Sequence, residues 1–187
     1  MEKEYKGGVT IDIEEIIKRA QRGDDDAFQQ LILIETPKLY KIAFIYVKNE
    51  PDALDILQDA IYKAYISIHK LKFPDHFTTW IIRILINTAI DHLKKRQHVL
   101  PLNEEILIKS YSENNSQIED RVVLSNAIDL LEEKYKSVII LKYFKDFSNQ
   151  QIAEVLGYPI GTVKTYLHRS IKELKTYFKE GYCHEKN

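Results

Sequence analysis

Apolar residues recur at three- and four-residue spacing along most of this chain, which is the period of amphipathic helices. In the first half, this spacing predicts helices over residues 13–23, 24–46, 51–69 and 77–97. Asp24 suits the N-cap of the second segment, and Pro51 suits the first turn of the third. Pro37 interrupts the second segment, so we expect the helix to kink or to restart there.

Helical spacing is lost between residues 98 and 117, where asparagine, serine and glutamate are frequent. Such a composition is typical of an extended linker. Helical spacing resumes at residue 118, and no convincing strand pattern or internal repeat is found. We therefore predict an all-α fold class, with two small helical domains at residues 12–97 and 118–179 joined by this linker. Residues 1–11 are expected to be a disordered tail, and residues 180–187 a C-terminal tail.

Two helices separated by a tight turn are predicted near the C-terminus. Ser148 and Gln151 have the spacing of a capping box, which marks the start of the first helix. Gly157 and Pro159 end that helix, and the second begins near Ile160. This order is the helix-turn-helix arrangement, in which the second helix lies in the major groove of DNA.

The outward face of this second helix carries small, imidazole and basic side chains. Arginine and lysine can reach guanine edges or phosphates, and small residues let the backbone approach DNA closely. The candidate DNA-contacting residues here are Gly161, Thr162, Lys164, Thr165, His168, Arg169 and Lys172. A basic face can also be the solvated side of an ordinary helix, but the capped first helix and the short turn favour DNA binding.

The helix predicted over residues 51–69 carries an acidic flank. Asp55, Gln58 and Asp59 lie at positions i, i+3 and i+4, and Ile56 is expected on the outer side beside them. An exposed aliphatic residue flanked by acids suits the docking of a basic partner helix. A paired-carboxylate or metal site is disfavoured because no histidine stands at ligand spacing nearby. A solvated acidic face without a partner is the plain alternative.

The helix predicted over residues 77–97 combines aromatic, polar and basic residues. Aromatic rings stack on unpaired bases, asparagine can read a base edge, and basic side chains hold a strand. The candidate DNA-contacting residues here are Phe77, Thr79, Arg83, Asn87, Lys94, Lys95 and Arg96. Trp80 and its apolar neighbours have the spacing of a core, so we expect Trp80 to be mostly buried.

The net charge is −1 over 187 residues, so any nucleic-acid binding must come from local basic patches. The single cysteine, Cys183, lies in the predicted C-terminal tail, so no disulfide framework, metal cluster or cofactor is expected. No apolar run has the length of a membrane-spanning helix, and no signal-peptide core follows the charged N-terminus. We therefore expect a cytoplasmic protein without membrane insertion.

Three segments carry a family resemblance. They are DILQDA (residues 55–60), FTTWIIRILINTAIDHLKKR (residues 77–96) and PIGTVKTYLHR (residues 159–169). Together they resemble the extracytoplasmic-function sigma factors of bacterial RNA polymerase, in the sigma-70 family, over residues 13–178. The resemblance implies a promoter-specificity subunit, not an enzyme by itself, that directs initiation at a promoter with minus-thirty-five and minus-ten elements. A role in a stress or envelope-signal response is the corresponding expectation.

The resemblance also implies partners for the first domain. The acidic helix of the family docks on the clamp helices of the largest polymerase subunit. Asp55, Gln58 and Asp59 match it, with aspartate at 59 where glutamate is common. The loop before Phe77 and the helix after it match the part that opens the minus-ten element and captures a flipped base, with Asn87 among the matching positions.

For the second domain, the resemblance implies recognition of the minus-thirty-five element and contact with the polymerase flap. Lys164, Thr165, His168 and Arg169 match the groove-facing positions, and histidine at 168 departs from the family pattern. The linker would thread the polymerase cleft. An anti-sigma factor is a further expected partner.

Two other classes of protein are alternatives to this interpretation. A response-regulator-like transcription factor has a similar Thr-Val-Lys helix, but it needs a receiver domain of alternating strands and helices, which residues 1–97 do not show. A helical adaptor that binds only proteins has no need of Gly161, Thr165, His168 and Arg169 on one outward face.

Overall fold

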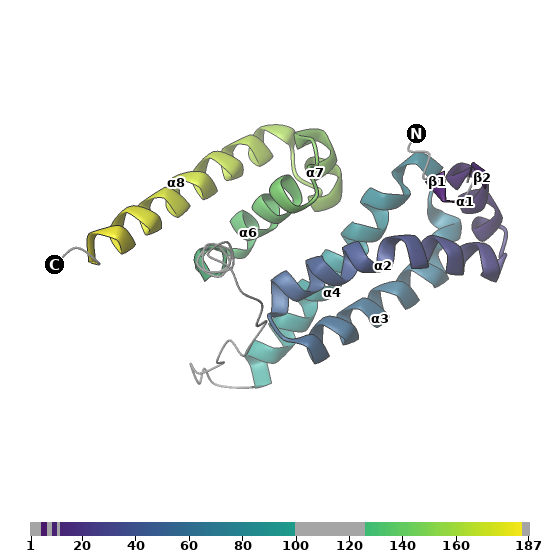
Figure 1. Cartoon of the computed structure of the whole chain (residues 1–187), viewed down its shortest axis with the longest axis horizontal. Helices are drawn as coiled ribbons and strands as arrows, with labels where there is room; N and C mark the ends of the chain where they lie inside the picture. Colours follow the sequence, from purple (N-terminus) through teal and green to yellow (C-terminus); the bar gives the residue numbers. More distant parts are fainter. Residues whose placement is uncertain (1–4, 7–8, 11, 100–125, 185–187) are drawn as a thin grey trace. The chain divides into compact units, whose positions relative to one another are not determined.

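The computed structural model describes residues 5–6, 9–10, 12–99 and 126–184 (Figure 1). The chain divides into two compact units, residues 1–106 and 107–187. Most of the predicted linker and the first residues of the second predicted domain, residues 100–125, lie outside the described residues.

The helices of the first unit begin where the sequence supplies capping side chains. α1 (Ile13–Gln21), α2 (Asp25–Val47) and α3 (Glu50–Ser67) follow Asp12, Asp24 and Asn49, whose side chains each accept a hydrogen bond from a first-turn backbone N–H. The chain then passes through two 3-10 turns, η1 (Ile68–Lys70) and η2 (Pro74–His76), into α4 (Phe77–Val99). The predicted helices of this unit are therefore confirmed.

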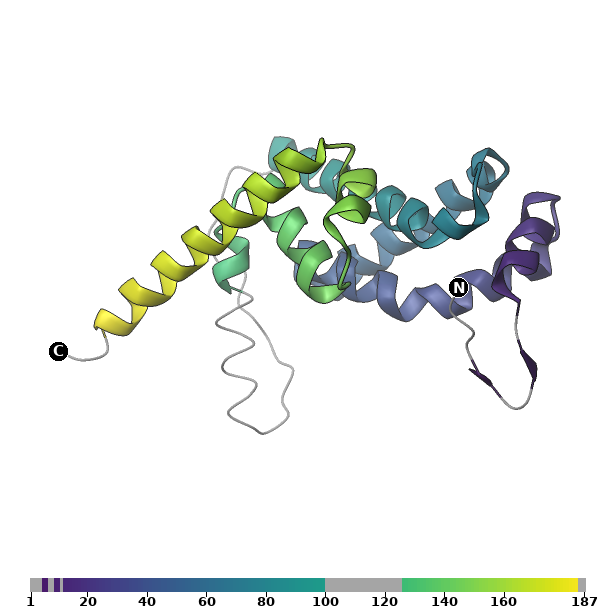
Figure 2. The same ribbon diagram turned by 90° about the horizontal axis from the view of Figure 1, so that it is seen from above.

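α2, α3 and α4 pack against one another, and α1 packs on α2 (Figures 1 and 2). Most of the large residues of this core come from α2 and α4, whereas α3 contributes Ile56, Leu57 and several alanines, which let the helix axes approach closely. The fully buried members include Leu31, Leu39, Ile42, Ala53, Ala60, Ala64, Ile81, Ile82, Leu85 and Ile86.

α2 passes through Pro37 as one helix of 23 residues, so the restart predicted at this proline is wrong. Proline removes one backbone hydrogen bond, but the turns on both sides are held by packing on α3 and α4. Just before the proline, the Thr36 hydroxyl donates a 2.7 Å hydrogen bond to the Ile32 carbonyl. Tertiary packing thus overrides the local break.

A short antiparallel ladder precedes α1. β1 (Tyr5–Lys6) pairs with β2 (Val9–Thr10), in a stretch that we expected to be disordered. Two residues per strand are too few to produce the alternating pattern by which a strand is recognised in a sequence.

The second unit is also helical. A helical stretch at residues 126–129 precedes α6 (Glu133–Ile139), the π-helical η3 (Ile140–Phe144), α7 (Asn149–Leu156) and α8 (Ile160–His184). The core residues are Ala127, Ile128, Val138, Ile140, Leu141, Ile152, Val155 and Val163. α8 extends beyond the predicted domain end at residue 179, so Cys183 stands on this helix. In the described part of the chain, no helix is long and apolar enough to cross a membrane.

Candidate nucleic-acid interface

The turn between α7 and α8 has the geometry predicted for a helix-turn-helix. The Ser148 hydroxyl accepts a 3.2 Å hydrogen bond from the Gln151 backbone N–H, and the Gln151 side chain accepts a 2.9 Å bond from the Ser148 N–H. This reciprocal pair confirms the capping box. At the other end, Gly157 has φ of 69°, a left-handed conformation that glycine adopts without strain.

α8 is fixed on its inner side by packing and by a buried hydroxyl. Val163 and Leu167 are buried, and the buried Ser170 hydroxyl lies 3.3 Å from the Tyr135 carbonyl on α6. Tyr166 contacts the rings of Tyr135 and Tyr158 edge-on, with centroids 5.4 and 5.6 Å apart. The opposite face of α8 is therefore held in a fixed orientation.

The outward face of α8 is open at most of the predicted DNA-contacting positions. Its exposed members are Gly161, Lys164, Thr165, His168, Arg169 and Lys172, and Thr162 is half-buried. A Cβ atom added to Gly161 would meet no atom within 4 Å. Packing within the unit therefore does not require glycine at this position.

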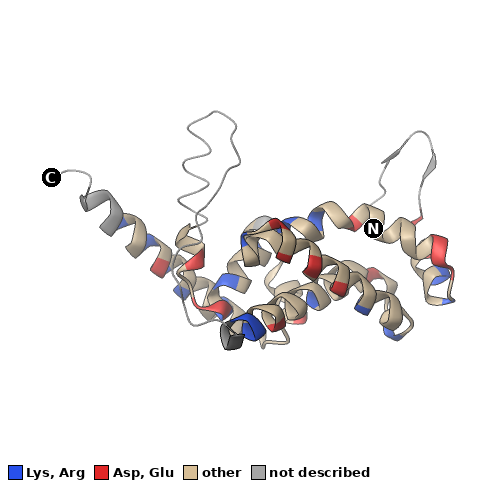
Figure 3. Cartoon of the chain, turned by 90° about the horizontal axis from the view of Figure 1, so that it is seen from below, with Lys and Arg blue, Asp and Glu red and all other residues tan. Residues whose placement is uncertain are grey.

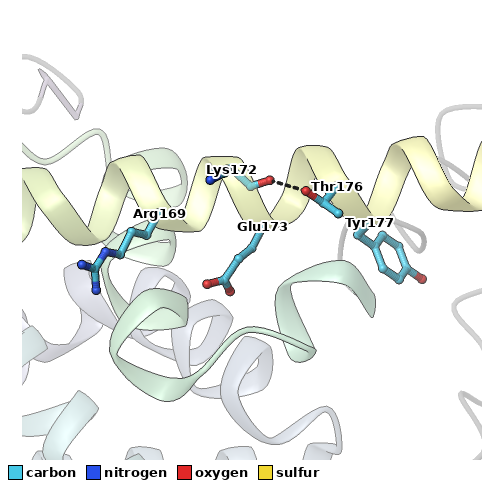
Figure 4. Close-up of a pocket in the computed structure, with 5 residues that line it drawn as sticks. All are labelled: Arg169, Lys172, Glu173, Thr176 and Tyr177. Atoms are coloured by element: carbon cyan, nitrogen blue, oxygen red, sulfur yellow. Dashed lines mark hydrogen bonds between the residues drawn. The ribbon is translucent and has the colours of Figure 1, made fainter.

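Arg169 differs from its neighbours on this helix. Its guanidinium lies 3.4 Å from the Tyr135 hydroxyl on α6, and this hydrogen bond raises the pKa of Arg169 above its usual value. A shallow pocket on α8 is lined by Arg169, Lys172, Glu173, Thr176 and Tyr177. Of these residues, Arg169, Glu173 and Tyr177 lie along the edge of α8 toward the rest of the unit (Figure 4). Arg169 therefore stands at the margin of the outward face, whose centre is formed by Thr165, His168 and Lys172.

The acidic flank of α3 is exposed at Asp55, Gln58 and Asp59. The placement predicted for Ile56 is wrong, because this side chain is only 1% exposed. The buried stripe of α3 runs through Ala53, Ile56, Leu57, Ala60 and Ala64, at spacings of three and four residues. The small alanines mark this stripe, and Ile56 lies on it.

Leu54 is 42% exposed, and it replaces Ile56 as the aliphatic residue beside the carboxylates. Farther along the same helix, Tyr62, Tyr65 and Ile66 are also exposed. The sequence analysis missed these residues, although they lie opposite the alanine-rich stripe and could have been found from it.

The start of α4 also corrects a predicted contact. Phe77 is 4% exposed and packs in the core, so its ring cannot stack on a base in this conformation. Phe73, in the loop between η1 and η2, is 64% exposed, and its ring centroid lies 5.8 Å from that of His76. Trp80 is half-buried, less covered than expected.

Further along α4, the polar candidates share one side. Thr79, Arg83 and Asn87 recur every four residues, and Arg83 and Asn87 are exposed. Lys94 and Lys95 are exposed near the C-terminal end. Arg96 instead pairs with Asp52 at the start of α3, where His92 Nε2 also lies 3.6 Å from Asp52 Oδ1. Arg96 is thus partly committed to holding α4 on α3.

Lysine and arginine residues are interspersed with aspartate and glutamate residues along the helices (Figure 3). No cluster of three or more histidine, cysteine or acidic side chains suited to a metal ion occurs among the residues that the structure describes.

Comparison with known proteins decides between the candidate families. A family model described as Sigma-70 region 2 matches residues 31–99, and one described as Sigma-70, region 4 matches residues 121–174. The ECF RNA polymerase sigma factor SigW of Bacillus subtilis is 35% identical over 182 residues, covering 90% of this chain and 97% of that protein. The chain belongs to the ECF sigma factors of RNA polymerase.

A second relative agrees with this assignment, and two solved structures share the fold. The sigma factor SigV of Bacillus subtilis is 38% identical over 136 residues, covering 73% of this chain and 81% of that protein. Among solved structures, CnrH in complex with the cytosolic domain of CnrY has a TM-score of 0.69 at 21% identity, covering 90% of this chain and 97% of that one. Sigma factor RpoE in complex with anti-sigma factor NepR, from Bartonella quintana, has a TM-score of 0.65 at 23% identity, covering 81% and 96%.

The identification settles the fold class and the function. The sigma factor is all-α, and it is a promoter-specificity subunit that binds core RNA polymerase and promoter DNA. The response-regulator alternative is not favoured, because a sigma region, and no receiver domain, occupies residues 31–99. The family is one of transcription initiation factors.

Proposed function

We propose that this sigma factor docks on core polymerase through α3 and reads its promoter through α4 and α8. The observation that carries the proposal is the outward face of α8. Exposed small and basic residues lie there, on the side of the helix opposite its buried residues, and α8 follows the capped helix α7 after a short turn. A helix presented in this way fits the major groove of the minus-thirty-five element.

The polymerase-binding surface would be the acidic flank of α3. Asp55, Gln58 and Asp59 are exposed together, and Leu54 supplies apolar area beside them. An interface with an apolar centre and a charged rim suits a basic, partly apolar pair of helices such as the polymerase clamp. Ile56 would act indirectly, by holding α3 on the core.

The minus-ten element would be opened and held along α4. Arg83 and Asn87 are exposed on one side with Thr79, and Lys94 and Lys95 can neutralise phosphates. Base stacking would fall to Phe73, because the ring of Phe77 is buried. The two phenylalanines would then have different roles: Phe77 would anchor α4 in the core, and Phe73 would contact the separated DNA strand.

At the minus-thirty-five element, Thr165, His168 and Lys172 would form the centre of the contact. Lys164 and Arg169 would flank it, and Gly161 and Thr162 would allow close approach at the start of α8. The second unit would also meet the polymerase flap.

The wider setting follows from the family. We infer that the protein acts in the cytoplasm as an initiation factor without enzymatic activity or a cofactor of its own. RpoE was solved with an anti-sigma factor, and we propose that an anti-sigma factor likewise restrains this protein until a stress or envelope signal releases it.

Run-off transcription on a library of genomic promoters, after pull-down with core polymerase, tests the proposal. The expected result is recovery of core polymerase and initiation at promoters that share two separated sequence elements. Failure to bind core, or initiation identical to that of core polymerase alone, would contradict it. A promoter recovered in this way serves as the template for the experiments below.

A further inference from the structure

A carboxylate occupies a core position of α2. Leu31, Glu35 and Leu39 recur every four residues along the buried stripe of this helix, and Glu35 is only 6% exposed. A carboxylate is rarely buried in this way unless it is paired or hydrogen-bonded, because burial removes its hydration. Ordinary packing does not explain the choice of glutamate here.

The contacts of Glu35 point to the start of α4. The Thr78 hydroxyl, on the second residue of α4, donates a 3.3 Å hydrogen bond to Glu35 Oε1. Lys38 Nζ, one turn along α2, lies 3.8 Å from the same oxygen and is half-exposed. Within the described parts of the chain, the buried Oε2 accepts no hydrogen bond. Thr78 is thus the inter-helix partner of this carboxylate.

The first turn of α4 favours a nearby negative charge. Its Phe77 N–H donates to the Pro74 carbonyl of η2, and the N–H groups of a first turn give this end of the helix a partial positive charge. The turn contains no acidic residue of its own. A carboxylate held against Thr78 supplies that charge from the neighbouring helix.

We propose that Glu35 is a positioning residue for promoter opening, which fixes the first turn of α4 through Thr78. The proposal deepens the function proposed for α4. Thr79 directly follows Thr78, and its hydroxyl donates a 2.9 Å bond to the His76 carbonyl, which continues the connection toward the loop that carries Phe73. A displaced first turn would therefore move the residues that meet the separated strand.

Replacing Glu35 by leucine separates positioning from stability. Leucine fills a similar volume and removes a buried carboxylate, so E35L should unfold at a temperature equal to or higher than the wild type. Promoter opening by the reconstituted holoenzyme, measured by permanganate reactivity of minus-ten thymines, should fall about tenfold, as expected for losing one hydrogen bond to a charged acceptor. E35Q keeps the acceptor oxygen but loses the charge, so its opening should lie between those of E35L and the wild type.

Three controls sharpen the result. T78V should lower opening as E35L does, and the double variant should be no worse than either single one, because both remove the same contact. T88V removes another buried hydroxyl of α4, which accepts a 3.0 Å bond from Lys63 Nζ, and should leave opening unchanged. On a template with a pre-opened minus-ten bubble, E35L should initiate like the wild type.

The outcomes distinguish this inference from the proposed function. A wild-type holoenzyme that cannot open the promoter contradicts the function proposed for α4. A wild-type holoenzyme that opens the promoter, with E35L equally active, overturns the positioning role alone. Equal loss by E35L on duplex and bubble templates would also overturn it.

Discussion

The exposed faces of α3 and α8 show how two helices of similar amphipathic design can serve different partners. Each buries a stripe of residues at three- and four-residue spacing, yet α3 exposes carboxylates with Leu54, Tyr62 and Ile66, whereas the outward face of α8 exposes Gly161 and a set of polar and basic side chains. A protein partner gains from large apolar anchors, which bury area when the complex forms. A DNA groove instead needs close backbone approach and donors for bases and phosphates.

Charge reversal on α3 should have the largest effect of the changes proposed below, because it should abolish binding to core polymerase. Asp55→Arg combined with Asp59→Arg adds repulsion to the lost attraction, at a cost of several kcal/mol across a charged interface. Pull-down with core polymerase should show no association, while circular dichroism shows unchanged helical content. Glu15→Arg with Asp26→Arg makes the same change of charge at exposed positions on α1 and α2 and should bind normally. Normal core binding by the folded α3 variant would remove the docking assignment.

A bulky residue at the start of α8 should affect DNA alone. Gly161→Leu meets no atom within 4 Å of its Cβ and replaces glycine inside a helix, so the free energy of unfolding should stay equal or rise by about 0.5–1 kcal/mol. The added side chain should separate α8 from the groove and weaken promoter binding by the holoenzyme about tenfold or more. Gln150→Leu adds a leucine at an exposed position on α7 and is the matched control. Undiminished promoter binding by Gly161→Leu would show that α8 does not approach DNA closely there.

Two basic residues on α8 should separate base reading from phosphate contact. Arg169→Ala should lose discrimination at one upstream base, worth about 1–3 kcal/mol. Lys172→Ala should instead weaken binding to all promoters alike, and it should reduce the slope of log affinity against log salt concentration by about one unit. Tyr135→Phe releases the Arg169 guanidinium and should change discrimination at the same base. Uniform weakening by Arg169→Ala across single-base promoter variants would make Arg169 a phosphate contact and leave base reading to Lys164, Thr165 and His168.

The helix caps of the two units should respond differently to pH. The pKa of Asp24 is lowered from 3.8 by hydrogen bonds from the Ala27 N–H and from Arg19, whereas the cap of α7 is the neutral Ser148. Ionised Asp24 therefore adds stability above the unfolded-state pKa, and that stability is lost as pH falls through the lower folded-state pKa. By calorimetry, the wild type should melt at a higher temperature than Asp24→Asn at pH 6, and the difference should shrink as the pH is lowered to 2. Ser148→Ala should lower the melting temperature equally at both values.

The sequence predicted those parts of the fold that depend on neighbouring residues. The capping box at Ser148, the turn at Gly157 and the cap at Asp24 lie within a few residues of the backbone that they stabilise, and the structure confirms each of them. The outward face of α8 followed from the same local periodicity.

The predictions were wrong where packing between segments distant in the sequence determines which side chains are buried. Ile56 is buried and Leu54 exposed because the alanines of α3 set the angle at which this helix meets its neighbours. Phe77 is buried because η2 packs on α1 and α4 packs on α2 and α3, and Arg96 is drawn to Asp52, a residue 44 positions earlier. The Tyr135 contact of Arg169 spans 34 positions and leaves no signal in the spacing of either helix.

One titration tests the central claim that docking and reading occupy separate faces. Labelled sigma factor is titrated first with core polymerase and then, as holoenzyme, with promoter DNA, for the wild type, the Asp55 and Asp59 double reversal, and a His168→Ala and Lys172→Ala double variant. We expect the α3 variant to fail at the first step, and the α8 variant to complete the first step with wild-type affinity and to fail only at the second. Loss of core binding by the α8 variant, or normal core binding by the α3 variant, would contradict the claim.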